Sequence, residues 1–357
     1  MEALIGILAG DGIGQEVMRE AIKAIETIGE SGGHRFKLED ALIGGAAIDA
    51  TGQAFPDATR ELAADADAIL LGAVGGPKWS DPDAPVRPEQ GLLDLRAAMG
   101  VYANLRPVKT HPVLHHASPL RAELLGDVDI LVVRELTGGI YFGDKTRSAD
   151  MATDVCTYHR HEIDRVIRMA AGFARDRRGK VTSVDKANVL ATSRLWRSVA
   201  DELFKTEFSD LQLEHLLVDA AAMHLLSRPR DFDVIVTENM FGDILTDEAS
   251  MLCGSLGMLP SASLNENGRG LYEPIHGSAP DIAGQDLANP CGMILSVALM
   301  LRYSFGLHTE ADLLEQAVYQ TLEAGQRTRD VAGPDEETAG TQAMGDAIVA
   351  KLRAAMG

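Results

Sequence analysis

The stretch that decides the fold is residues 237–248, TENMFGDILTDE, which directly follows the short run DVIV at 233–236. The apolar run is typical of a buried strand, and the stretch after it predicts a helix with Asn239 as its N-cap. On such a helix Asp243 and Asp247 are four residues apart, so both carboxylates share one face. Two like charges in this arrangement repel each other unless a cation lies between them. The pair is therefore either a solvated acidic face or a site for Mg²⁺ or Mn²⁺, which prefer carboxylate oxygens.

The composition is typical of an ordinary globular protein. The 357 residues are 46% hydrophobic and 24% charged, and this length is sufficient for two domains. The net charge of −20 argues against nucleic acid and anionic membranes as partners. Cys156, Cys253 and Cys291 are widely spaced and indicate free thiols. We recognise neither a signal peptide nor an apolar run of membrane length, and we expect a cytoplasmic protein.

A glycine-rich turn, GDGIG at 10–14, follows an apolar strand at 4–8 and precedes an apolar helical stripe. This order is similar to a dinucleotide-binding fingerprint, but Gln15 stands where that fingerprint has its third glycine. We therefore expect only a turn at the carboxyl end of a strand, the end at which α/β folds bind ligands.

Three predicted strands, including the one before residue 237, are each followed by a polar residue that could take part in chemistry. The runs at 181–184, 211–218 and 234–236 lead to Lys186, Asp219 and Asp243. Because ligands bind beyond the carboxyl ends of the strands in open α/β sheets, we expect these side chains to converge. Lys186 is a candidate general base, although a lysine at a strand end is more often simply solvated.

Three arginines at the ends of predicted elements form a second group: Arg96, Arg106 and Arg134. Each guanidinium can bind a carboxylate through two parallel hydrogen bonds, so three arginines indicate a substrate with more than one carboxylate, or else surface charges. Tyr141, between glycines, is either a general acid, if a neighbouring cation lowers its pKa, or a buried structural tyrosine. The segment 137–159 around it predicts a long hairpin or arm.

Six segments occur together and in a fixed order: GDGIG at 10–14, NLRP at 104–107, RELTGGIY at 134–141, DKANV at 185–189, ENMFGDILTD at 238–247 and HGSAPDIAG at 276–284. With this set, nearly the whole chain resembles the β-decarboxylating dehydrogenases, which include isopropylmalate, isocitrate, homoisocitrate and tartrate/malate dehydrogenases. One departure is Gln15, where the family commonly has proline, and we expect a slightly less rigid turn.

The segment PEQGLLDLR at 88–96 is similar to the isopropylmalate branch of this family. Leu92 and Leu93 would provide an apolar pocket for an isopropyl group, whereas an isocitrate enzyme needs polar or cationic groups for a third carboxylate. Glu89 would repel such a carboxylate. The resemblance thus implies NAD-dependent oxidative decarboxylation of 3-isopropylmalate in leucine biosynthesis. A tartrate/D-malate dehydrogenase is the alternative enzyme, and a non-catalytic dicarboxylate-binding protein the alternative in another class.

The resemblance also implies roles for the polar residues. Arg96, Arg106 and Arg134 bind the substrate carboxylates. Asp219, Asp243 and Asp247 bind Mg²⁺ or Mn²⁺, and Asp219 also belongs to the substrate site. Lys186 takes the hydroxyl proton, and Tyr141 protonates the product carbon. The residues implied to bind NAD are His276, Gly277, Ser278, Ala279, Pro280, Asp281, Ile282 and Asn289.

The architecture that the resemblance implies is a two-domain α/β fold with mixed sheets, which is not a Rossmann fold. A discontinuous first domain, residues 1–101 plus 254–357, carries the cofactor. A second domain, residues 102–253, carries the arm, the metal site and the dimer contact. The resemblance further implies a homodimer with shared active sites, in which Lys186 and Asp219 enter the partner subunit's site.

Overall fold

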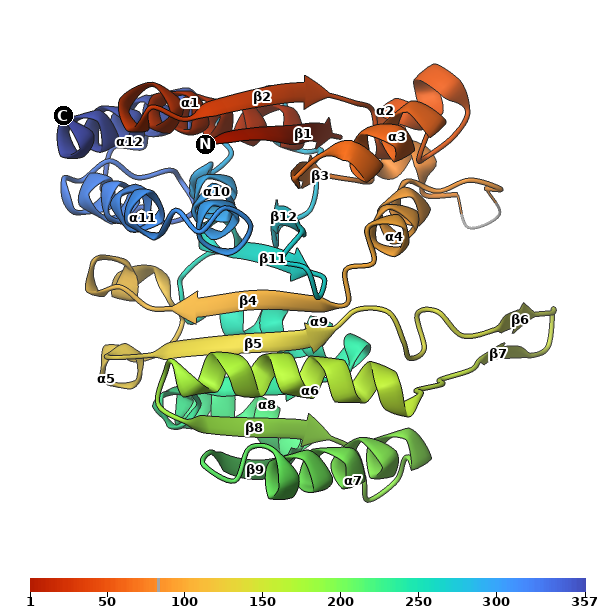
Figure 1. The fold of residues 1–357 in the computed structure, drawn as a ribbon. Helices are drawn as coiled ribbons and strands as arrows, with labels where there is room; N and C mark the ends of the chain where they lie inside the picture. The colour runs from red at the N-terminus through yellow and green to blue at the C-terminus, as the bar shows by residue number, and fades with distance from the viewer. Residues whose placement is uncertain (82–83) are drawn as a thin grey trace. The chain divides into compact units, whose positions relative to one another are not determined.

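The computed structural model describes residues 1–81 and 84–357. The chain divides into two compact units. Unit 1 comprises Met1–Val101 and Gly254–Gly357, and unit 2 is the continuous segment Tyr102–Cys253 (Figure 1). None of the helices described for residues 1–81 and 84–357 combines the length and apolar character of a membrane span.

The strands of unit 1 have the order β2-β1-β3-β12-β11. They are β1 (Glu2–Gly10), β2 (Arg35–Asp40), β3 (Ala68–Ala73), β11 (Pro260–Leu264) and β12 (Gly270–Pro274). Neighbouring strands are parallel except β11, which is antiparallel to β12. This mixed order differs from the doubly wound order of a Rossmann domain. The predicted α/β class with mixed sheets is therefore confirmed.

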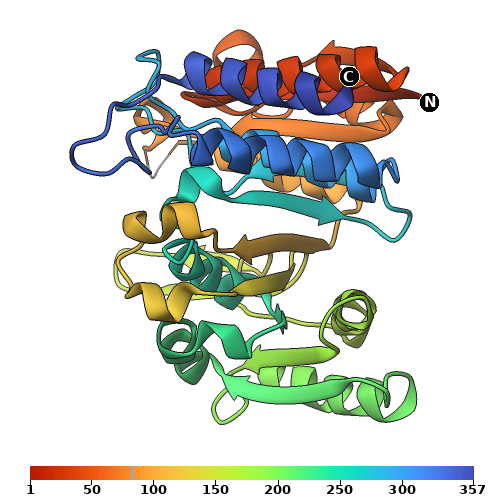
Figure 2. The ribbon, with the colours of Figure 1, turned by 90° about the vertical axis from the view of Figure 1, so that its left-hand side faces the viewer.

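The apolar side chains on both faces of this sheet are buried. Ile69 and Leu71 of β3 belong to a core cluster with Leu95, while Leu70 between them is equally buried but outside that cluster. Alternating side chains point to opposite faces, so helices must cover both. These helices are α1 (Gly14–Gly32), α2 (Gly44–Thr51), α3 (Asp57–Asp65), α4 (Pro88–Met99), α10 (Cys291–Tyr303), α11 (His308–Glu323) and α12 (Thr341–Met356). Short 3₁₀ turns occupy η1 (Pro77–Trp79) and η4 (Leu256–Met258). Figure 2 shows α11 and α12 lying side by side.

The strands of unit 2 have the order β4-β5-β10-β8-β9. They are β4 (Ala103–Lys109), β5 (Asp129–Glu135), β8 (Lys180–Asp185), β9 (Gln212–Leu217) and β10 (Val234–Thr237). β4 is antiparallel to β5, and the other pairs are parallel. Thr237 is in register with both Arg134 and Val184, so these strands end at the same edge of the sheet. The register thus brings the carboxyl ends of these strands to one edge, whereas the side chains of Lys186, Asp219 and Asp243 do not form a single group.

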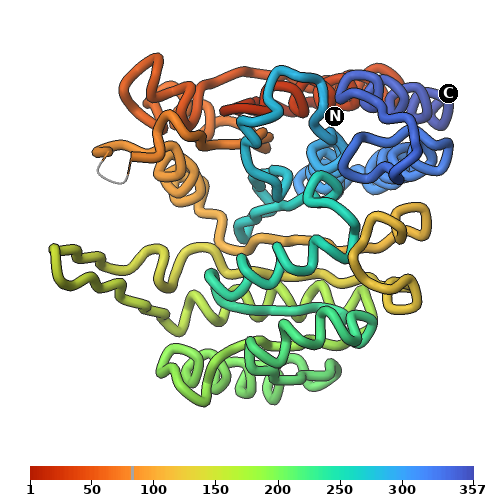
Figure 3. The backbone as a smooth tube through the Cα atoms, turned by 180° about the vertical axis from the view of Figure 1, so that it is seen from behind, coloured from red at the N-terminus to blue at the C-terminus, as the bar shows by residue number. Residues whose placement is uncertain are grey.

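The main helices of unit 2 are α6 (Arg160–Arg175), α7 (Ala191–Thr206), α8 (Val218–Ser227) and α9 (Asn239–Ser250). Helices α6 and α7 lie on one face of the sheet, and α8 and α9 lie on the other (Figures 1 and 3). The shorter elements are η2 (Pro112–Ala117), α5 (Ala122–Leu125) and η3 (Pro229–Asp231).

The predicted arm is a hairpin of β6 (Lys145–Arg147) and β7 (Ala152–Asp154), which projects from unit 2 (Figure 3). Its strands cover only a small part of the predicted segment 137–159, and the second strand ends at Asp154. The exposed hairpin pairs only with itself in the described chain, so it has few contacts that would extend its strands.

Candidate active site

Helix α9 begins at the carboxyl edge of the unit 2 sheet, directly after β10. Its N-cap is Glu238, whose carboxylate accepts hydrogen bonds from the N–H groups of Met240 and Phe241. The prediction that Asn239 caps the helix was therefore wrong by one position. The reason is that the Asn239 side-chain oxygen accepts two hydrogen bonds from Arg134, from Nε at 3.1 Å and from Nη2 at 2.8 Å. The Asn239 side chain thus binds the Arg134 guanidinium and does not cap the helix.

Two buried arginines meet the acidic face of α9. Arg134 Nη1 donates to Asp243 Oδ1, and Arg106 Nη2 lies 3.4 Å from the same oxygen. Arg106 also donates to the Thr246 hydroxyl, and its Nη1 lies 3.7 Å from Asp247 Oδ1. Strand β4 supplies Arg106 and strand β5 supplies Arg134, so their backbones are fixed by the sheet. The structure thus brings these four predicted residues together.

Tyr141 joins this cluster. Its hydroxyl donates to Asp243 Oδ2 at 3.0 Å, and the Arg134 guanidinium lies 5.9 Å from the centre of its ring. Burial, together with the negative charge of Asp243, raises the pKa of the phenol above its usual value. The lowering of this pKa by a neighbouring cation, which the sequence analysis required of a general acid, is therefore not found, because burial and Asp243 outweigh the charge of Arg134. The phenol keeps its proton at neutral pH.

The turn that presents Tyr141 is held by a buried carboxylate. Glu135 accepts hydrogen bonds from the N–H groups of Thr137 and Gly138, both at 2.8 Å. Gly139 then adopts a φ of 80°, and a Cβ there would lie 2.7 Å from the Tyr158 hydroxyl. A glycine is required because the left-handed backbone and the close ring both exclude a side chain.

The two carboxylates of α9 differ in electrostatic environment. Burial alone would raise the pKa of Asp243, but the charges of Arg134 and Arg106 outweigh it and hold the pKa below the ordinary value. Burial raises the pKa of Asp247, and the Asp243 charge adds to this effect against the opposing charge of Arg106. A hard cation would suit the pair, since it supplies positive charge and takes oxygen ligands.

Within one chain, Asp219 does not lie together with Asp243 and Asp247. Among the residues that the structure describes, no three His, Cys, Asp or Glu side chains are close enough together to hold a metal ion. Asp219 lies in the first turn of α8, and Lys186 Nζ lies 2.5 Å from its Oδ1. The hydrogen bond from Lys186 lowers the pKa of Asp219. The predicted residues of unit 2 therefore form two groups.

In unit 1, helix α4 carries Glu89, Leu92, Leu93 and Arg96. The helix begins at Pro88, because proline is well suited to the first helical position. Leu92 is half-buried and packs against the core cluster, and Leu93 is also half-buried.

Arg96 is the third predicted arginine. Its Nη2 donates to Glu273 Oε1 at 2.8 Å, and both side chains are largely buried. Its Nε is buried without a hydrogen-bond partner among the described residues. Such an orphaned donor fits an anionic substrate group.

The predicted cofactor loop lies after β12 in unit 1. Burial lowers the pKa of His276, whose Nδ1 bonds the Gly277 carbonyl while its buried Nε2 has no partner in the described part of the chain. Ala279 adopts a left-handed φ of 36°, and its carbonyl accepts from Ile282. Asp281 is exposed. An orphaned imidazole nitrogen and an exposed carboxylate fit a ligand rich in hydroxyl groups.

The other predicted cofactor residues are placed differently. Ser278 is buried, and its carbonyl accepts from Ile13, whereas Gly277 and Pro280 are exposed. Asn289 is buried, accepts from the Cys291 N–H at the start of α10, and donates to Asp330 at 3.0 Å. The described contacts of Asn289 are therefore structural.

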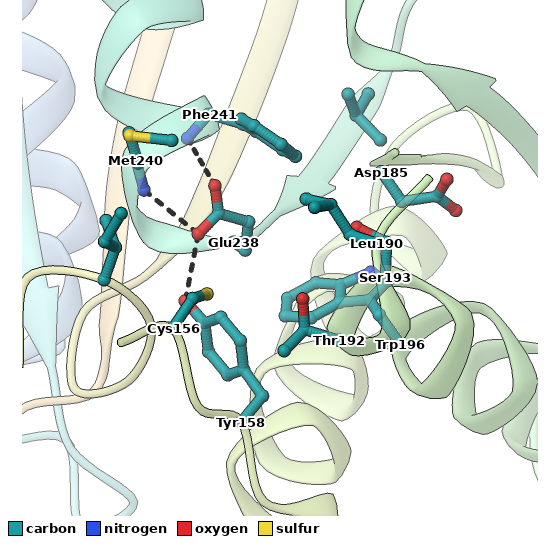
Figure 4. Close-up of a pocket in the computed structure, with 12 residues that line it drawn as sticks. Cys156, Tyr158, Asp185, Leu190, Thr192, Ser193, Trp196, Glu238, Met240 and Phe241 are labelled. Carbon is teal, nitrogen blue, oxygen red and sulfur yellow. Dashed lines mark hydrogen bonds between the residues drawn. The ribbon is translucent and has the colours of Figure 1, made fainter. Parts of the chain in front are cut away.

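A separate apolar recess of about 170 Å³ lies beside the start of α9 (Figure 4). Its wall includes Cys156, Tyr158 and Trp196, and the Tyr158 hydroxyl donates to Glu238 at 3.3 Å. Burial raises the pKa of the Cys156 thiol, so the thiol is a poor nucleophile at neutral pH. None of the predicted site residues lines this recess.

The sequence matches the family model described as isocitrate/isopropylmalate dehydrogenase over residues 4–348. The chain is 55% identical to 3-isopropylmalate dehydrogenase of Anaeromyxobacter dehalogenans, covering 99% of this chain and all of the relative. It is 57% identical to 3-isopropylmalate dehydrogenase of Geobacillus kaustophilus over 92% of this chain and 90% of the relative.

Among solved structures, isocitrate dehydrogenase from Methylococcus capsulatus superposes with a TM-score of 0.87 at 34% identity, covering 98% of this chain and 99% of that one. Members of the matching family are dehydrogenases that act on a small-molecule substrate with a nucleotide cofactor and a divalent metal. On these similarities, and on the site geometry above, the chain belongs to the isocitrate/isopropylmalate dehydrogenase family.

Proposed function

We propose that the protein catalyses the NAD-dependent oxidative decarboxylation of (2R,3S)-3-isopropylmalate to 4-methyl-2-oxopentanoate and CO₂, a step of leucine biosynthesis. The observation that carries this proposal is the identity of 52–57% to relatives that are all named 3-isopropylmalate dehydrogenase. A biosynthetic enzyme of this kind acts in the cytoplasm, which is where we place it.

The choice of substrate within the family rests on α4. Leu92 and Leu93 are both half-buried, so each retains apolar surface for a branched alkyl group. Glu89 stands one turn earlier on the same helix and opposes an extra carboxylate. The isocitrate enzyme from Methylococcus capsulatus is similar in fold but only 34% identical, so it has less weight in this choice.

Three arginines bind the two carboxylates of the malate backbone. Arg106 and Arg134 are buried in unit 2 with acidic partners, and the buried Nε of Arg96 in unit 1 has no hydrogen-bond partner among the described residues. Arginine is suited to this task because its planar guanidinium binds a carboxylate through parallel hydrogen bonds.

The metal is Mg²⁺ or Mn²⁺, held by Asp243 and Asp247 on α9 and by Asp219 on α8. These carboxylates supply the oxygen ligands that such cations prefer. When bound, the cation supplies Lewis acidity toward the substrate oxygens. Among the described residues Asp219 does not join the other two aspartates. In the proposed dimer it serves the site of the partner subunit.

Two side chains move protons. Lys186 accepts the proton of the C2 hydroxyl, directly or through one water, and bound NAD⁺ would supply the acceptor for the hydride that leaves C2. The C3–C4 bond then breaks, CO₂ leaves and its bonding electrons remain at C3. Tyr141, whose raised pKa keeps it protonated, donates a proton to C3.

The NAD site is the loop after β12, with residues His276 to Ile282 as its main contacts and Asn289 at its far end. Asp281 is exposed and accepts hydrogen bonds from the ribose hydroxyls of the adenosine. The orphaned His276 Nε2 provides a further polar contact for the cofactor.

A homodimer with shared sites completes the proposal. Helices α8 and α9 pack together and carry exposed apolar side chains. These are Met223 and Leu226 on α8 and Ile244 on α9. Apolar surface of this kind is typical of a protein–protein contact. In such a dimer Lys186 and Asp219, already paired at 2.5 Å, enter the partner's site together.

The test is a comparison of NADH production from 3-isopropylmalate, D-malate, isocitrate and homoisocitrate under the same conditions. The proposal requires the highest kcat/KM for 3-isopropylmalate. A higher value for D-malate would support the tartrate/D-malate alternative. Binding without turnover of any of the four would support the non-catalytic dicarboxylate-binding alternative.

A further inference from the structure

The glycine-rich turn at the start of α1 contacts the loop after β12. The Ile13 N–H donates to the Ser278 carbonyl at 2.9 Å. Gly12 adopts a φ of 54°, and a Cβ built there would lie 2.1 Å from the same carbonyl oxygen. The turn therefore fits against the first half of the loop so closely that only glycine is accommodated.

Glu16, three residues after Ile13, makes a second contact, with the other half of the loop. Glu16 Oε2 accepts from the Gly284 N–H and Oε1 accepts from the Asp286 N–H, both at 3.1 Å. Glu16 is only 7% exposed, whereas Gly284 and Asp286 are exposed residues with left-handed backbones at φ of 77° and 58°. Hydrogen bonds to an ionised carboxylate are stronger than those between neutral groups. The carboxylate therefore fixes a backbone that most residues avoid.

We infer that Glu16 is a positioning residue for the nucleotide cofactor: its carboxylate fixes the loop between Ser278 and Asp286 in the form that binds NAD⁺. This inference rests on the proposed NAD site. Asp281 lies between the two contact points, and Ala279 beside the first is held at a φ of 36°. A non-glycine residue in this region persists only where its surroundings determine the backbone.

The far end of the loop is anchored as well. The backbone carbonyl of Asp286 accepts a hydrogen bond from the Thr341 N–H. The side-chain Oδ1 of Asp286 accepts another from the Gln342 N–H at 2.9 Å. These bonds tie Asp286 to the start of α12, so the loop is held from two helices. Among the described residues, Glu16 on α1 is the one side chain that bonds both Gly284 and Asp286.

The competing explanation is that Glu16 merely stabilises α1, because an acidic side chain in the first turn of a helix interacts favourably with its dipole. Glu16→Gln separates the two explanations. Glutamine keeps the length of the side chain but has one acceptor oxygen, so one of the two loop N–H groups loses its partner. Glu16→Asp keeps the charge at the helix end and withdraws both oxygens by one methylene.

The matched control is Glu20→Gln, one turn later on α1. Glu20 is equally buried, and its Oε2 bonds Lys23 Nζ at 2.6 Å, with no described hydrogen bond to the loop. Each protein is examined as the full chain. Calorimetry measures the NAD⁺ dissociation constant, steady-state kinetics separate KM from kcat, and amide exchange is followed at Gly284 and Asp286 without cofactor.

Both Glu16 variants should bind NAD⁺ about tenfold more weakly, the scale of losing one charge-assisted hydrogen bond, and should raise the KM for NAD⁺ equally. The kcat at saturating NAD⁺ should change less than about twofold, because the reacting groups lie elsewhere. Exchange at Gly284 and Asp286 should accelerate in both variants and stay as in the parent in Glu20→Gln.

Unchanged NAD⁺ affinity, unchanged exchange at both amides, or an equal loss of affinity in Glu20→Gln would each overturn the inference. A parent protein that does not bind NAD⁺ would refute the proposed cofactor instead. In that case accelerated exchange would still establish that Glu16 holds the loop.

Discussion

The Tyr141 hydroxyl donates to Asp243 Oδ2 at 3.0 Å, while the guanidinium of Arg134 binds the other oxygen of the same carboxylate. The proposed proton donor and the proposed metal ligand are thus in direct contact. The negative charge of Asp243 helps to keep the phenol protonated. A change at Asp243 should therefore affect both metal binding and the protonation of Tyr141.

Removing the metal should abolish turnover. Excess EDTA should stop NADH production, and added Mg²⁺ or Mn²⁺ should restore it, because the cation supplies the Lewis acidity. Asp243→Asn should lower kcat by at least about a hundredfold, the scale of losing one electrostatic stabiliser, and should reduce the rate far more than the stability. Glu248→Gln, on the same helix, is the control and should retain activity. Full activity in excess EDTA would contradict the metal assignment.

Substrate preference should follow the apolar residues of α4. A methylene in an apolar pocket contributes about 1–3 kcal/mol to discrimination, so 3-isopropylmalate should be a far better substrate than unsubstituted D-malate. Leu93→Ser should lower kcat/KM for 3-isopropylmalate at least about tenfold while changing that for D-malate much less. Initial rates with both substrates provide the measurement. Equal losses for the two substrates would show that Leu93 does not contact the isopropyl group.

Hybrid dimers test the shared site. Lys186→Ala and Tyr141→Phe homodimers should both be nearly inactive, because each lacks one proton-transfer group. If Lys186 serves the partner's site, a hybrid of the two places both lesions in one site and leaves the other intact. Dissociation, mixing and reassociation should then restore up to about half of the parental activity per hybrid dimer, as one site of two remains.

Mass analysis of two differently tagged chains would verify that hybrids have formed. Verified hybrids that remain as inactive as the parents would mean that Lys186 and Tyr141 serve one site from the same subunit. Mixing each variant with itself is the control and should restore nothing.

The stability of the chain should decrease below about pH 6.5 because of His276. Burial lowers the pKa of this imidazole in the folded chain, so there it remains neutral, whereas the unfolded chain takes up a proton near its ordinary pKa of about 6.5. The unfolded state binds more protons, and stability is therefore lost as the pH falls below that value.

The loss attributable to His276 cannot exceed about 1.4 kcal/mol per pH unit, which corresponds to one proton. His276→Asn should flatten the fall of the melting temperature between pH 7 and pH 5. His308→Asn, which removes an exposed imidazole from α11, is the control. An unchanged slope in His276→Asn would assign the acid sensitivity to other groups.

Much of unit 2 was predictable because its signals are local. The apolar run before residue 237 and the spacing of Asp243 and Asp247 specify a strand followed by a helix, and both were found. Lys186 and Asp219 were placed correctly beyond strand ends, since parallel pairing of β8 and β9 brings those ends to one edge. A glycine turn alone, in contrast, did not identify a dinucleotide site.

What the sequence did not predict depends on partners that are distant along the chain. Glu16 accepts hydrogen bonds from backbone groups 268 and 270 residues away, and a backbone N–H carries no sequence signal. Asn239 is a second example. The known preference of asparagine for the N-cap predicted a local role, whereas its side chain contacts Arg134, 105 residues away. Such contacts emerge only when the sheets bring the segments together.

Cofactor choice should favour NAD⁺ over NADP⁺. Asp281 is exposed on the loop after β12, where its carboxylate is free to accept hydrogen bonds from the ribose hydroxyls and to repel a 2′-phosphate. The kcat/KM for NAD⁺ should exceed that for NADP⁺ by at least about a hundredfold, the combined scale of losing a charge-assisted bond and gaining a repulsion. Asp281→Lys with Ile282→Tyr should narrow or reverse this ratio, because the lysine attracts the phosphate that the aspartate repels.

The cofactor experiment has a control in the same loop. Gln285→Glu adds a negative charge at an exposed position four residues after Asp281, and should change the ratio of the two kcat/KM values much less than the double substitution. Initial rates with each cofactor at saturating 3-isopropylmalate give the ratio. Equal use of NAD⁺ and NADP⁺ by the unmodified protein would show that Asp281 does not contact the ribose. A large effect of Gln285→Glu would instead indicate that the total charge of the loop, rather than one carboxylate, selects the cofactor.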